Sequence, residues 1–396
     1  MQPTSPPIPT EPPPTHTLGS HRARWLCNGT EAFEAMRAVI DAASRSVRLE
    51  CYLVRAAGPA VPLFDALLRA RQRGLDVRVL LDAFGSNELP ADFLQPLRAA
   101  GARVALFNPS RWLRRSFRDH RKLLVCDEHT AIVGGFNVGP EYDGDGVTRG
   151  WRDLGLLIEG PAAAQLAQGF DGMQVLAPFT PRELRLLRPR LRRARRRLHG
   201  VLPAEVAVLA TGPGWGQRRM HRRILRDLHG ARHIAIMAAY FLPARRIRHE
   251  LVRCVRRGGS VELLLAGHSD VTIAKLAGEH LYRHLLARGI SLYEYRPQIL
   301  HAKLLLIDDI VYVGSCNLDR RSFEINFELL LRLESPALAG EARQFFARDL
   351  KLSMPIDAAR WRASLGWWQR LRRRFAYWVL AYLDPLIASS RARQRW

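Results

Sequence analysis

The sequence carries one short motif twice, once in each half, and this repetition constrains the fold more than any other feature. Both copies have the spacing His-x-Lys-x4-Asp, given by His120, Lys122 and Asp127 in the first half and by His301, Lys303 and Asp308 in the second. A glycine-containing element that ends in asparagine follows each copy, at Asn137 and at Asn317. The chain has only four lysines, and the motifs hold two of them. Matched positions of this kind indicate two copies of one domain.

The order of the predicted elements repeats as well. In the first half, hydrophobic periodicity predicts helices at 31–43 and 61–73 and strands at 47–53, 77–82, 103–107, 122–126, 130–133 and 154–158. In the second half, it predicts helices at 245–257 and 270–288 and strands at 233–239, 261–265, 291–295, 302–307, 310–313 and 328–333. Gly74 and Gly258 mark two of the helix ends. The alternation favours an α/β fold in which helices cover layered sheets.

Composition along the chain predicts five segments. Residues 1–20 are rich in proline and predict a disordered tail, whereas residues 21–178 and 201–352 contain the two lobes. Residues 179–200 form an arginine-rich linker, with nine arginines from Arg182 to Arg197. This linker is either a solvated basic segment or a phosphate-binding one. Residues 353–396 form a basic and aromatic carboxy-terminal segment.

The overall charge narrows the class of partner. A length of 396 residues accommodates two full domains, and a formal net charge of +24 favours a polyanionic partner, either nucleic acid or an anionic lipid surface. Five cysteines without C-x-x-C spacing argue against a disulfide scaffold and favour a reducing cytosol. The amino terminus lacks the apolar core of a signal peptide, and no apolar run approaches the roughly 20 residues that span a bilayer.

The carboxy-terminal segment combines aromatic residues with a cluster of arginines between Trp361 and Tyr382. Aromatic rings and cations both find favourable contacts in the headgroup layer of a membrane. We therefore predict a membrane-interface segment here. The alternative is a helix that packs on the protein's own core.

Paired histidines, lysines and asparagines suit displacement at a phosphodiester. One neutral imidazole attacks phosphorus, while a second, protonated imidazole gives a proton to the leaving oxygen and later takes one from the acceptor. The groups expected to hold the phosphate and to stabilise developing charge are Lys122, Lys303, Asn137, Asn317 and Ser315. This arrangement requires no metal and no cofactor. Two satisfied core histidines are the alternative, which explains neither the lysines nor the duplication.

Four acidic residues accompany the motifs. Asp153 and Glu328 occupy equivalent positions in the two repeats and are candidates for the carboxylates that fix the histidine tautomers. Ordinary acids at strand edges are the alternative interpretation. Asp127 and Asp308 belong to the catalytic motif, but each ends a strand at a turn, where we expect a mainly structural role.

The two motifs, with Gly314-Ser315-Cys-Asn317 and Asn326-Phe-Glu328 after the second, resemble those of the phospholipase D superfamily. Ala239-Tyr240-Phe241-Leu-Pro243 and the arginines before His120 are most similar to the bacterial cardiolipin synthase branch, of the type without amino-terminal membrane spans. The resemblance covers roughly residues 25–352. It implies a monomer of two duplicated lobes, each a mixed β-sheet flanked by helices, with one active site at the pseudo-twofold interface.

The same resemblance implies the activity. Such enzymes move a phosphatidyl group from one phosphatidylglycerol to the hydroxyl of another and release glycerol, through a phosphohistidine. By this resemblance His120 is the nucleophile and His301 the general acid and base, and the reverse assignment stays open. The expected location is peripheral, on the cytoplasmic face of the bacterial inner membrane. The alternative is a hydrolase of the phospholipase D type or a nuclease that binds DNA or RNA through a basic groove.

Overall fold

The computed structural model describes residues 13–108, 117–177, 205–212, 216–363 and 366–383. The first half of the chain folds, in order, into β1 (His16–Leu18), β2 (His21–Leu26), α1 (Gly29–Ala42), β3 (Ser46–Cys51), α2 (Ala60–Gln72), β4 (Asp76–Asp82), α3 (Gln95–Ala99), β5 (Arg103–Phe107), β6 (Lys122–Cys126), β7 (Thr130–Gly134), η1 (Pro140–Tyr142), β8 (Gly155–Glu159) and α4 (Pro161–Leu176). The predicted linker at 179–200 lies outside the described residues.

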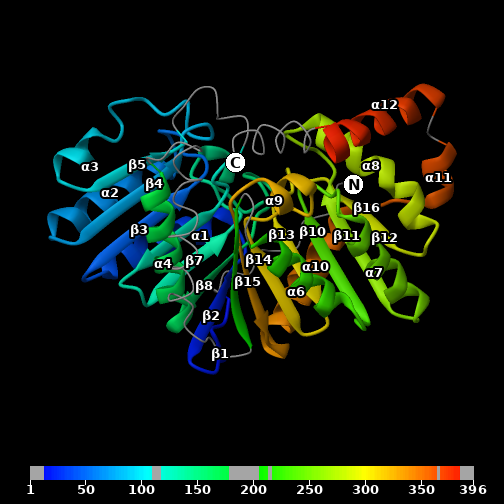
Figure 1. The fold of residues 1–396 in the computed structure, drawn as a ribbon, viewed down its shortest axis with the longest axis horizontal. Coiled ribbons are helices and arrows are strands. Elements are labelled where there is room, and N and C mark those ends of the chain that lie inside the picture. Colours follow the sequence, from blue (N-terminus) through cyan, green and yellow to red (C-terminus); the bar gives the residue numbers. More distant parts are fainter. Residues whose placement is uncertain (1–12, 109–116, 178–204, 213–215, 364–365, 384–396) are drawn as a thin grey trace.

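The second half repeats this order with additions at its end. It folds into β9 (Val206–Thr211), α6 (Gln217–Leu228), β10 (His233–Ala238), α7 (Arg245–Arg256), β11 (Ser260–Ala266), α8 (Thr272–Leu286), β12 (Ser291–Tyr295), β13 (Lys303–Ile307), β14 (Ile310–Gly314), α9 (Arg320–Glu324), β15 (Glu328–Glu334), α10 (Pro336–Lys351), β16 (Ser353–Pro355), α11 (Ala358–Ala363), α12 (Trp367–Trp378) and η2 (Val379–Leu383). Figure 1 shows the two halves side by side as two lobes.

Each lobe is built on one mixed eight-stranded sheet. The strand orders are β1-β2-β8-β7-β6-β3-β4-β5 and β16-β12-β11-β10-β13-β14-β15-β9. In the first sheet, β3, β4 and β5 are parallel and the other neighbours are antiparallel; the second sheet repeats this with β10, β11 and β12. The two motif strands, β6 and β13, are central and every residue in them is buried, which explains their apolar sequences. The predicted α/β duplication is confirmed.

Two short strands correct the predicted segment boundaries. β1 lies inside the span predicted as a disordered tail, yet it pairs with β2, and His16 Nε2 lies 2.7 Å from Glu341 Oε2. β16 lies inside the predicted carboxy-terminal segment, yet it pairs with β12 at the edge of the second sheet. Three residues are too few to show the alternation of apolar and polar side chains that predicts a strand. Such short edge strands are stabilised mainly by the strand with which they pair, and that partner cannot be inferred from their own sequence.

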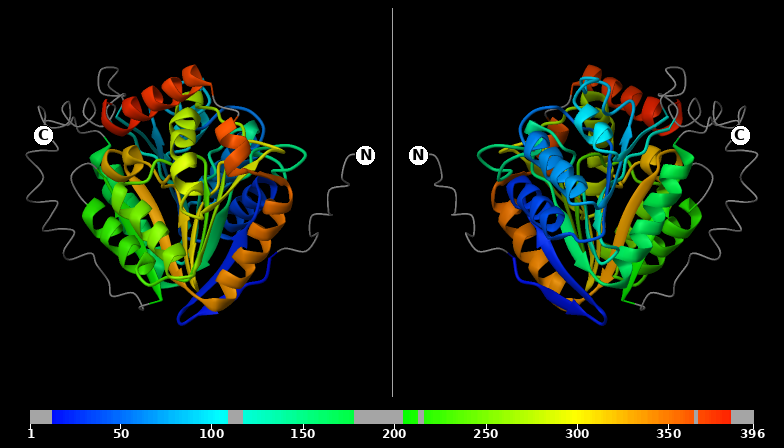
Figure 2. Two further views of the ribbon diagram at one scale, coloured as in Figure 1. Left: turned by 90° about the vertical axis from the view of Figure 1, so that its right-hand side faces the viewer. Right: turned by 90° about the vertical axis from the view of Figure 1, so that its left-hand side faces the viewer.

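The three largest apolar clusters of the described residues form the core of the protein. One core fills the space between the two sheets and includes residues from β6, β7 and β8 as well as from β13, β14 and β15. A second core lies under α1 and α2, and a third under α6, α7 and α8. Because the first core is shared, the lobes are joined through their inner faces. Figure 2 shows the strands between helices on either side.

Two helix ends were predicted from glycines, and the backbone explains why glycine is used there. Helix α2 ends just before Gly74, which has φ +91°, and α7 ends just before Gly258, which has φ +85°. These values lie in the left-handed region that other residues adopt only with strain, so glycine ends both helices at low cost.

The carboxy-terminal segment divides its residues between two environments. Ala376 and Tyr377 of α12 pack on Ala277 and Leu242, Arg373 Nε lies 2.6 Å from Glu279 Oε2, and Trp361 of α11 lies against Tyr282. The opposite side of α12 and of the following turn leaves large apolar side chains exposed: Trp367, Trp368, Leu371, Phe375, Trp378 and Tyr382. Each of the two interpretations drawn from the sequence therefore fits a different face of this segment.

Within the part of the chain that the structure describes, no helix has both the length and the hydrophobicity needed to cross a bilayer. Helix α12 instead lies across one end of the molecule, as Figure 2 shows in red.

Candidate active site

The two histidines of the repeated motif are held by backbone contacts between the lobes. Just before His120, Asp119 forms a parallel bridge with Phe327, and just before His301, Leu300 forms the equivalent bridge with Arg152. His120 N donates to Phe327 O at 3.0 Å, and His301 N donates to Arg152 O at 2.8 Å. Each histidine is therefore anchored on the residue that precedes a carboxylate of the other lobe.

The result is a crossed pair of histidine–carboxylate contacts. His120 of the first lobe places Nδ1 3.1 Å from Glu328 Oε1 of the second lobe. His301 of the second lobe places Nδ1 2.6 Å from Asp153 Oδ2 of the first lobe. Both carboxylates are fully buried, whereas the His120 and His301 side chains retain 13% and 6% exposure. The residues predicted as tautomer-fixing acids are thus in contact with the histidines, and the pairing runs between lobes.

The geometry fixes the protonation of His120. Its Nδ1 also lies 3.2 Å from the backbone oxygen of Ser315, which can only accept a hydrogen bond. Nδ1 therefore carries the proton and Nε2 keeps a lone pair. Burial, and then the neighbouring Lys122, lower the pKa of His120 to about 4, so this imidazole is neutral at physiological pH. Nε2 has no hydrogen-bond partner among the described residues, so its lone pair is unoccupied.

His301 has a different environment. Its contact with Asp153 is shorter, as expected when a proton is shared with an anion. Burial and the adjacent Lys303 lower the pKa of His301, whereas Asp153 opposes this shift. Burial alone would raise the pKa of Asp153, but His301 and Lys303 hold it below its usual range. Asp153 is therefore ionised and favours an imidazolium at His301 whenever a proton is available.

The two motif lysines lie beside the histidines. Lys122 Nζ donates to His120 O at 2.6 Å, and Lys303 Nζ donates to His301 O and lies 2.9 Å from His301 Nδ1. Burial, and then the positive charge of Lys122, lower the pKa of Lys303 to about 8. Burial also lowers the pKa of Lys122. Two buried ammonium groups in one site make it strongly attractive to a phosphate anion.

The remaining predicted phosphate ligands are less uniform. Asn317 is buried, and its Oδ1 has no hydrogen-bond partner in the described structure. Asn137 is also buried, but its Nδ2 donates to the Tyr142 hydroxyl at 2.6 Å. The Ser315 hydroxyl donates to Glu328 Oε2 at 2.5 Å and accepts from Leu329 N. Ser315 is thus placed to orient the carboxylate beside His120.

Asp127 and Asp308 lie away from this site, although they belong to the repeated motif. Each follows the far end of its strand, β6 or β13, and adopts a left-handed conformation with φ +56° or +48°. The Asp127 carboxylate accepts from the backbone N–H groups of residues 44, 45 and 46, and the Asp308 carboxylate from those of residues 232 and 233. Both aspartates stabilise turns, and neither lies with the histidines and lysines of the candidate active site.

The two halves of the site differ beside the carboxylates. The first lobe has Gly135 where the second has Ser315, and a Cβ at Gly135 would lie 2.1 Å from Asp153 Oδ1. Asp153 therefore occupies the space that the Ser315 side chain occupies in the other lobe. Position 135 must therefore be glycine, because any side chain there would collide with the Asp153 carboxylate.

Four aromatic and basic residues at the site were not predicted. The Tyr52 ring lies 5.1 Å from the His120 ring, and Arg118 donates to the Tyr52 hydroxyl at 2.9 Å. Tyr142 and Trp151 lie 5.2 and 5.5 Å from His301. Lone aromatic residues in loops carry no periodic signal, and Tyr52, which lies inside the predicted strand at 47–53, stands directly after the observed strand β3. The three rings give the histidines a largely aromatic surrounding.

Comparisons with known proteins agree with this geometry. A family model described as "Cardiolipin synthase, PLD-like domain" matches residues 36–173 and 224–350, one match in each lobe. The chain belongs to this family. Cardiolipin synthase A of Pseudomonas entomophila is 32% identical over 350 residues, covering 86% of this chain and 71% of that protein. Cardiolipin synthase 1 of Bacillus anthracis is 30% identical over 383 residues, covering 92% and 72%.

A solved structure shows the same fold at low sequence similarity. The crystal structure of phosphatidylserine synthase from Haemophilus influenzae matches with a TM-score of 0.69 and 14% identity, over 94% of each chain. The cardiolipin synthase family accounts for both repeats and for their arrangement. This chain is accordingly an enzyme of the phosphatidyltransferase class.

Proposed function

We propose that the protein transfers the phosphatidyl group of one phosphatidylglycerol to the free hydroxyl of a second, forming cardiolipin and releasing glycerol. The crossed histidine–carboxylate pairs carry this proposal, because they supply one neutral and one protonatable imidazole to a single site. The proposed roles are nucleophile for His120, general acid and base for His301, phosphate binding for Lys122, Lys303, Asn137 and Asn317, and orientation of the histidines for Glu328, Ser315 and Asp153.

In the first step, His120 Nε2 attacks phosphorus and the bond from phosphorus to the glycerol oxygen breaks. His301 gives its proton to that oxygen, so neutral glycerol leaves. The bound phosphate counterbalances the charge of Lys122 and Lys303, which raises the pKa of His301 from its depressed value and loads it with the proton that it must deliver.

In the second step, the hydroxyl of another phosphatidylglycerol attacks the phosphohistidine. His301 now takes the hydroxyl proton, the phosphorus–nitrogen bond breaks, and His120 returns to its neutral state. Glu328 and Ser315 O hold the Nδ1 proton of His120 throughout, so Nε2 is the atom that bonds phosphorus in each cycle. One chain supplies every group in this scheme, which supports activity as a monomer.

We further propose that the enzyme works at an anionic membrane surface, on the cytoplasmic face, through α12. The exposed side chains at 367, 371, 375, 378 and 382 recur every three or four residues, so they form one stripe along the helix. Arg370, Arg372 and Arg374 lie beside this stripe and are exposed. Such a stripe suits shallow insertion among lipid headgroups.

The activity is tested with purified protein and phosphatidylglycerol vesicles without added metal. Cardiolipin and glycerol are expected in equal amounts. Phosphatidic acid and glycerol without cardiolipin would indicate a hydrolase. Cleavage of DNA, offered in a parallel reaction, without lipid turnover would instead indicate a nuclease.

The membrane contact is tested with Trp367→Ala combined with Trp378→Ala. Binding to phosphatidylglycerol vesicles is expected to weaken at least about tenfold, because two large apolar side chains are no longer transferred from water into the membrane. Turnover of detergent-dispersed substrate should be retained. Trp361→Ala is the control, since that ring packs on Tyr282 and its loss lowers thermal stability. Vesicle binding unchanged in the double variant would rule out the α12 stripe as the contact.

A further inference from the structure

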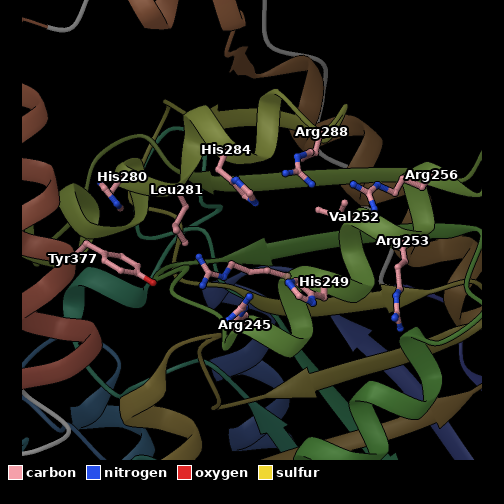
Figure 3. Close-up of a pocket in the computed structure, with 11 residues that line it drawn as sticks. Arg245, His249, Val252, Arg253, Arg256, His280, Leu281, His284, Arg288 and Tyr377 are labelled. Carbon is pink, nitrogen blue, oxygen red and sulfur yellow. The ribbon is translucent and has the colours of Figure 1, made fainter.

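A cationic groove lies between α7 and α8, on the outer face of the second lobe. It has a volume of about 610 Å³, and its lining contains five arginines, three histidines and no acidic residue. Figure 3 shows these side chains around the groove. The five arginines are Arg245, Arg248, Arg253, Arg256 and Arg288.

Helical spacing explains how so many cations meet. On α7, positions 245, 248, 249, 252 and 256 recur at intervals that keep them on one face. On the facing helix α8, positions 280, 281 and 284 do the same, and Arg288 follows just beyond its end. The apolar side chains of Val252 and Leu281 also line the groove, and arginine stems can pack on apolar surface of this kind while their charged ends stay in solvent.

The positive charge of the groove is largely unneutralised. Arg253 lies 2.8 Å from Glu250. The other four arginines form no ion pair with any described carboxylate, and Arg248 Nε is buried without a hydrogen-bond partner. Burial and neighbouring arginines, Arg248 among them, also lower the pKa of His280 and His284. Cations held together without counterions repel one another, so binding of an anion here is favourable.

The position of the groove indicates the source of this anion. Tyr377 of α12 forms one wall, and its ring lies 4.8 Å from the ring of His280. The same helix exposes the stripe of Trp367, Phe375 and Trp378 on its other side. A membrane that accepts this stripe brings its headgroups to the adjacent groove.

We propose that the α7–α8 groove binds the phosphate headgroups of anionic phospholipids, outside the active site. Guanidinium groups match phosphate oxygens in bidentate geometry, and the volume exceeds that of one phosphate, so the groove accommodates a headgroup. The groove then holds the enzyme on bilayers that are rich in its own anionic substrate and product. This role rests on the membrane-active function proposed above.

The test replaces three unpaired arginines by glutamine, as R248Q, R256Q and R288Q in one full-length protein. A matched control removes the same charge from exposed arginines of α6, as R218Q, R222Q and R226Q. Binding is measured by sedimentation with phosphatidylcholine vesicles that contain 0, 20 or 40% phosphatidylglycerol. Each cation near an anionic surface raises the binding affinity about fivefold. The groove variant should therefore bind the vesicles about a hundredfold more weakly than the wild type, whereas the affinity of the control should fall much less.

Equal losses in both variants would overturn the proposal, because they would reflect net charge alone. Displacement from vesicles by millimolar inorganic phosphate, for wild type but not for the groove variant, would instead assign the groove to soluble phosphates. Loss of DNA binding with vesicle binding retained would assign it to nucleic acid. Turnover of detergent-dispersed phosphatidylglycerol separates this test from that of the catalytic proposal, since the groove variant should retain it whether or not vesicle binding falls.

Discussion

Helix α2 of the first lobe and α7 of the second occupy equivalent places, yet their arginines meet different environments. On α2, Arg69 lies 3.1 Å from Asp41, and Arg71 donates to the backbone oxygens of Ala100 and Leu75. On α7, Arg248 and Arg256 have no such partner within the described structure. One fold thus supports a neutralised surface in one lobe and a charged groove in the other.

The inner faces differ far less. Both lobes offer a histidine, a lysine and a carboxylate through equivalent bridges, and beside the carboxylates the change is from Gly135 and Asp153 to Ser315 and Glu328. Residues that must reach the same phosphate have little room to change, because a small displacement removes them from the reacting atoms. Outer helices carry no such requirement. The contrast between α2 and α7 therefore indicates a function that only the second lobe performs.

The largest expected effect breaks the near symmetry of the two histidines. His120→Ala should abolish the covalent phosphoenzyme, and His301→Ala should lower kcat by about 10²- to 10⁴-fold while the phosphoenzyme accumulates with an activated donor. Acid-quenched protein analysed by mass spectrometry would detect the adduct. An adduct that accumulates in the His120 variant instead would exchange the two roles.

A smaller effect sharpens the difference beside the carboxylates. Ser315→Gly should lower kcat about fivefold, since it removes one hydrogen bond from Glu328, whereas Gly135→Ser should cost far more because the new Cβ meets Asp153 Oδ1 at 2.1 Å. Steady-state kinetics on both variants, with thermal unfolding as the control for folding, would check this. Equal effects would mean that the two halves are sterically interchangeable.

The pH profile of kcat/KM tests the unequal environments of His120 and Lys303. His120 attacks only when neutral, so activity is present above its pKa of about 4 and is lost below it. Lys303 binds phosphate only as an ammonium, so activity is lost above its pKa of about 8. An acidic limb near pH 4 is expected from His120. On the alkaline side, activity should fall first as His301, whose pKa is lowered by burial and by Lys303, loses the proton that it must deliver, and then as Lys303 becomes neutral near pH 8. Lys303→Arg should move the second fall to higher pH, and a second fall that stays in place would belong to another group.

The smallest effect concerns the turn aspartates. Asp127→Asn should destabilise the fold by about 1–2 kcal/mol with kcat unchanged, because one carboxylate accepts three backbone N–H groups. Burial raises the pKa of Asp127, but these hydrogen bonds hold it below its usual value. Its contribution is therefore present above about pH 4 and lost as the pH falls further. Urea unfolding of the wild type and the variant at pH 7 and pH 3 measures the loss of stability and its pH dependence. A large fall in kcat would instead indicate that Asp127 has a catalytic role.

The local part of this structure could be predicted from the sequence because it depends on neighbours along the chain. The strand at Lys122–Cys126 and its counterpart at Lys303–Ile307 are apolar runs after a motif, and both were predicted within one residue. Asp153 and Glu328 were identified from the repeat. Their crossing to the opposite histidine could not be predicted, because it depends on how the sheets face each other through a shared core.

The groove shows the same limit on the outer surface. The spacing of Arg245, Arg248 and Arg256 is visible in the sequence, but arginines are common throughout the chain. Which of them lack an acidic partner depends on contacts distant in sequence, such as that of Arg69 with Asp41. Likewise, the sequence does not distinguish the exposed tryptophans of α12 from Trp361, which packs on Tyr282; that difference depends on how α11 and α12 pack on α8.

The crossed contacts have a consequence for the origin of the chain. A face that gives a histidine to its neighbour's acid, and receives a histidine on its own acid, is the self-complementary contact of an isologous dimer. The present protein has the architecture of such a dimer fused into one polypeptide. Two identical subunits must change every surface in duplicate, whereas a fused pair lets one copy acquire a feature that the other never carries.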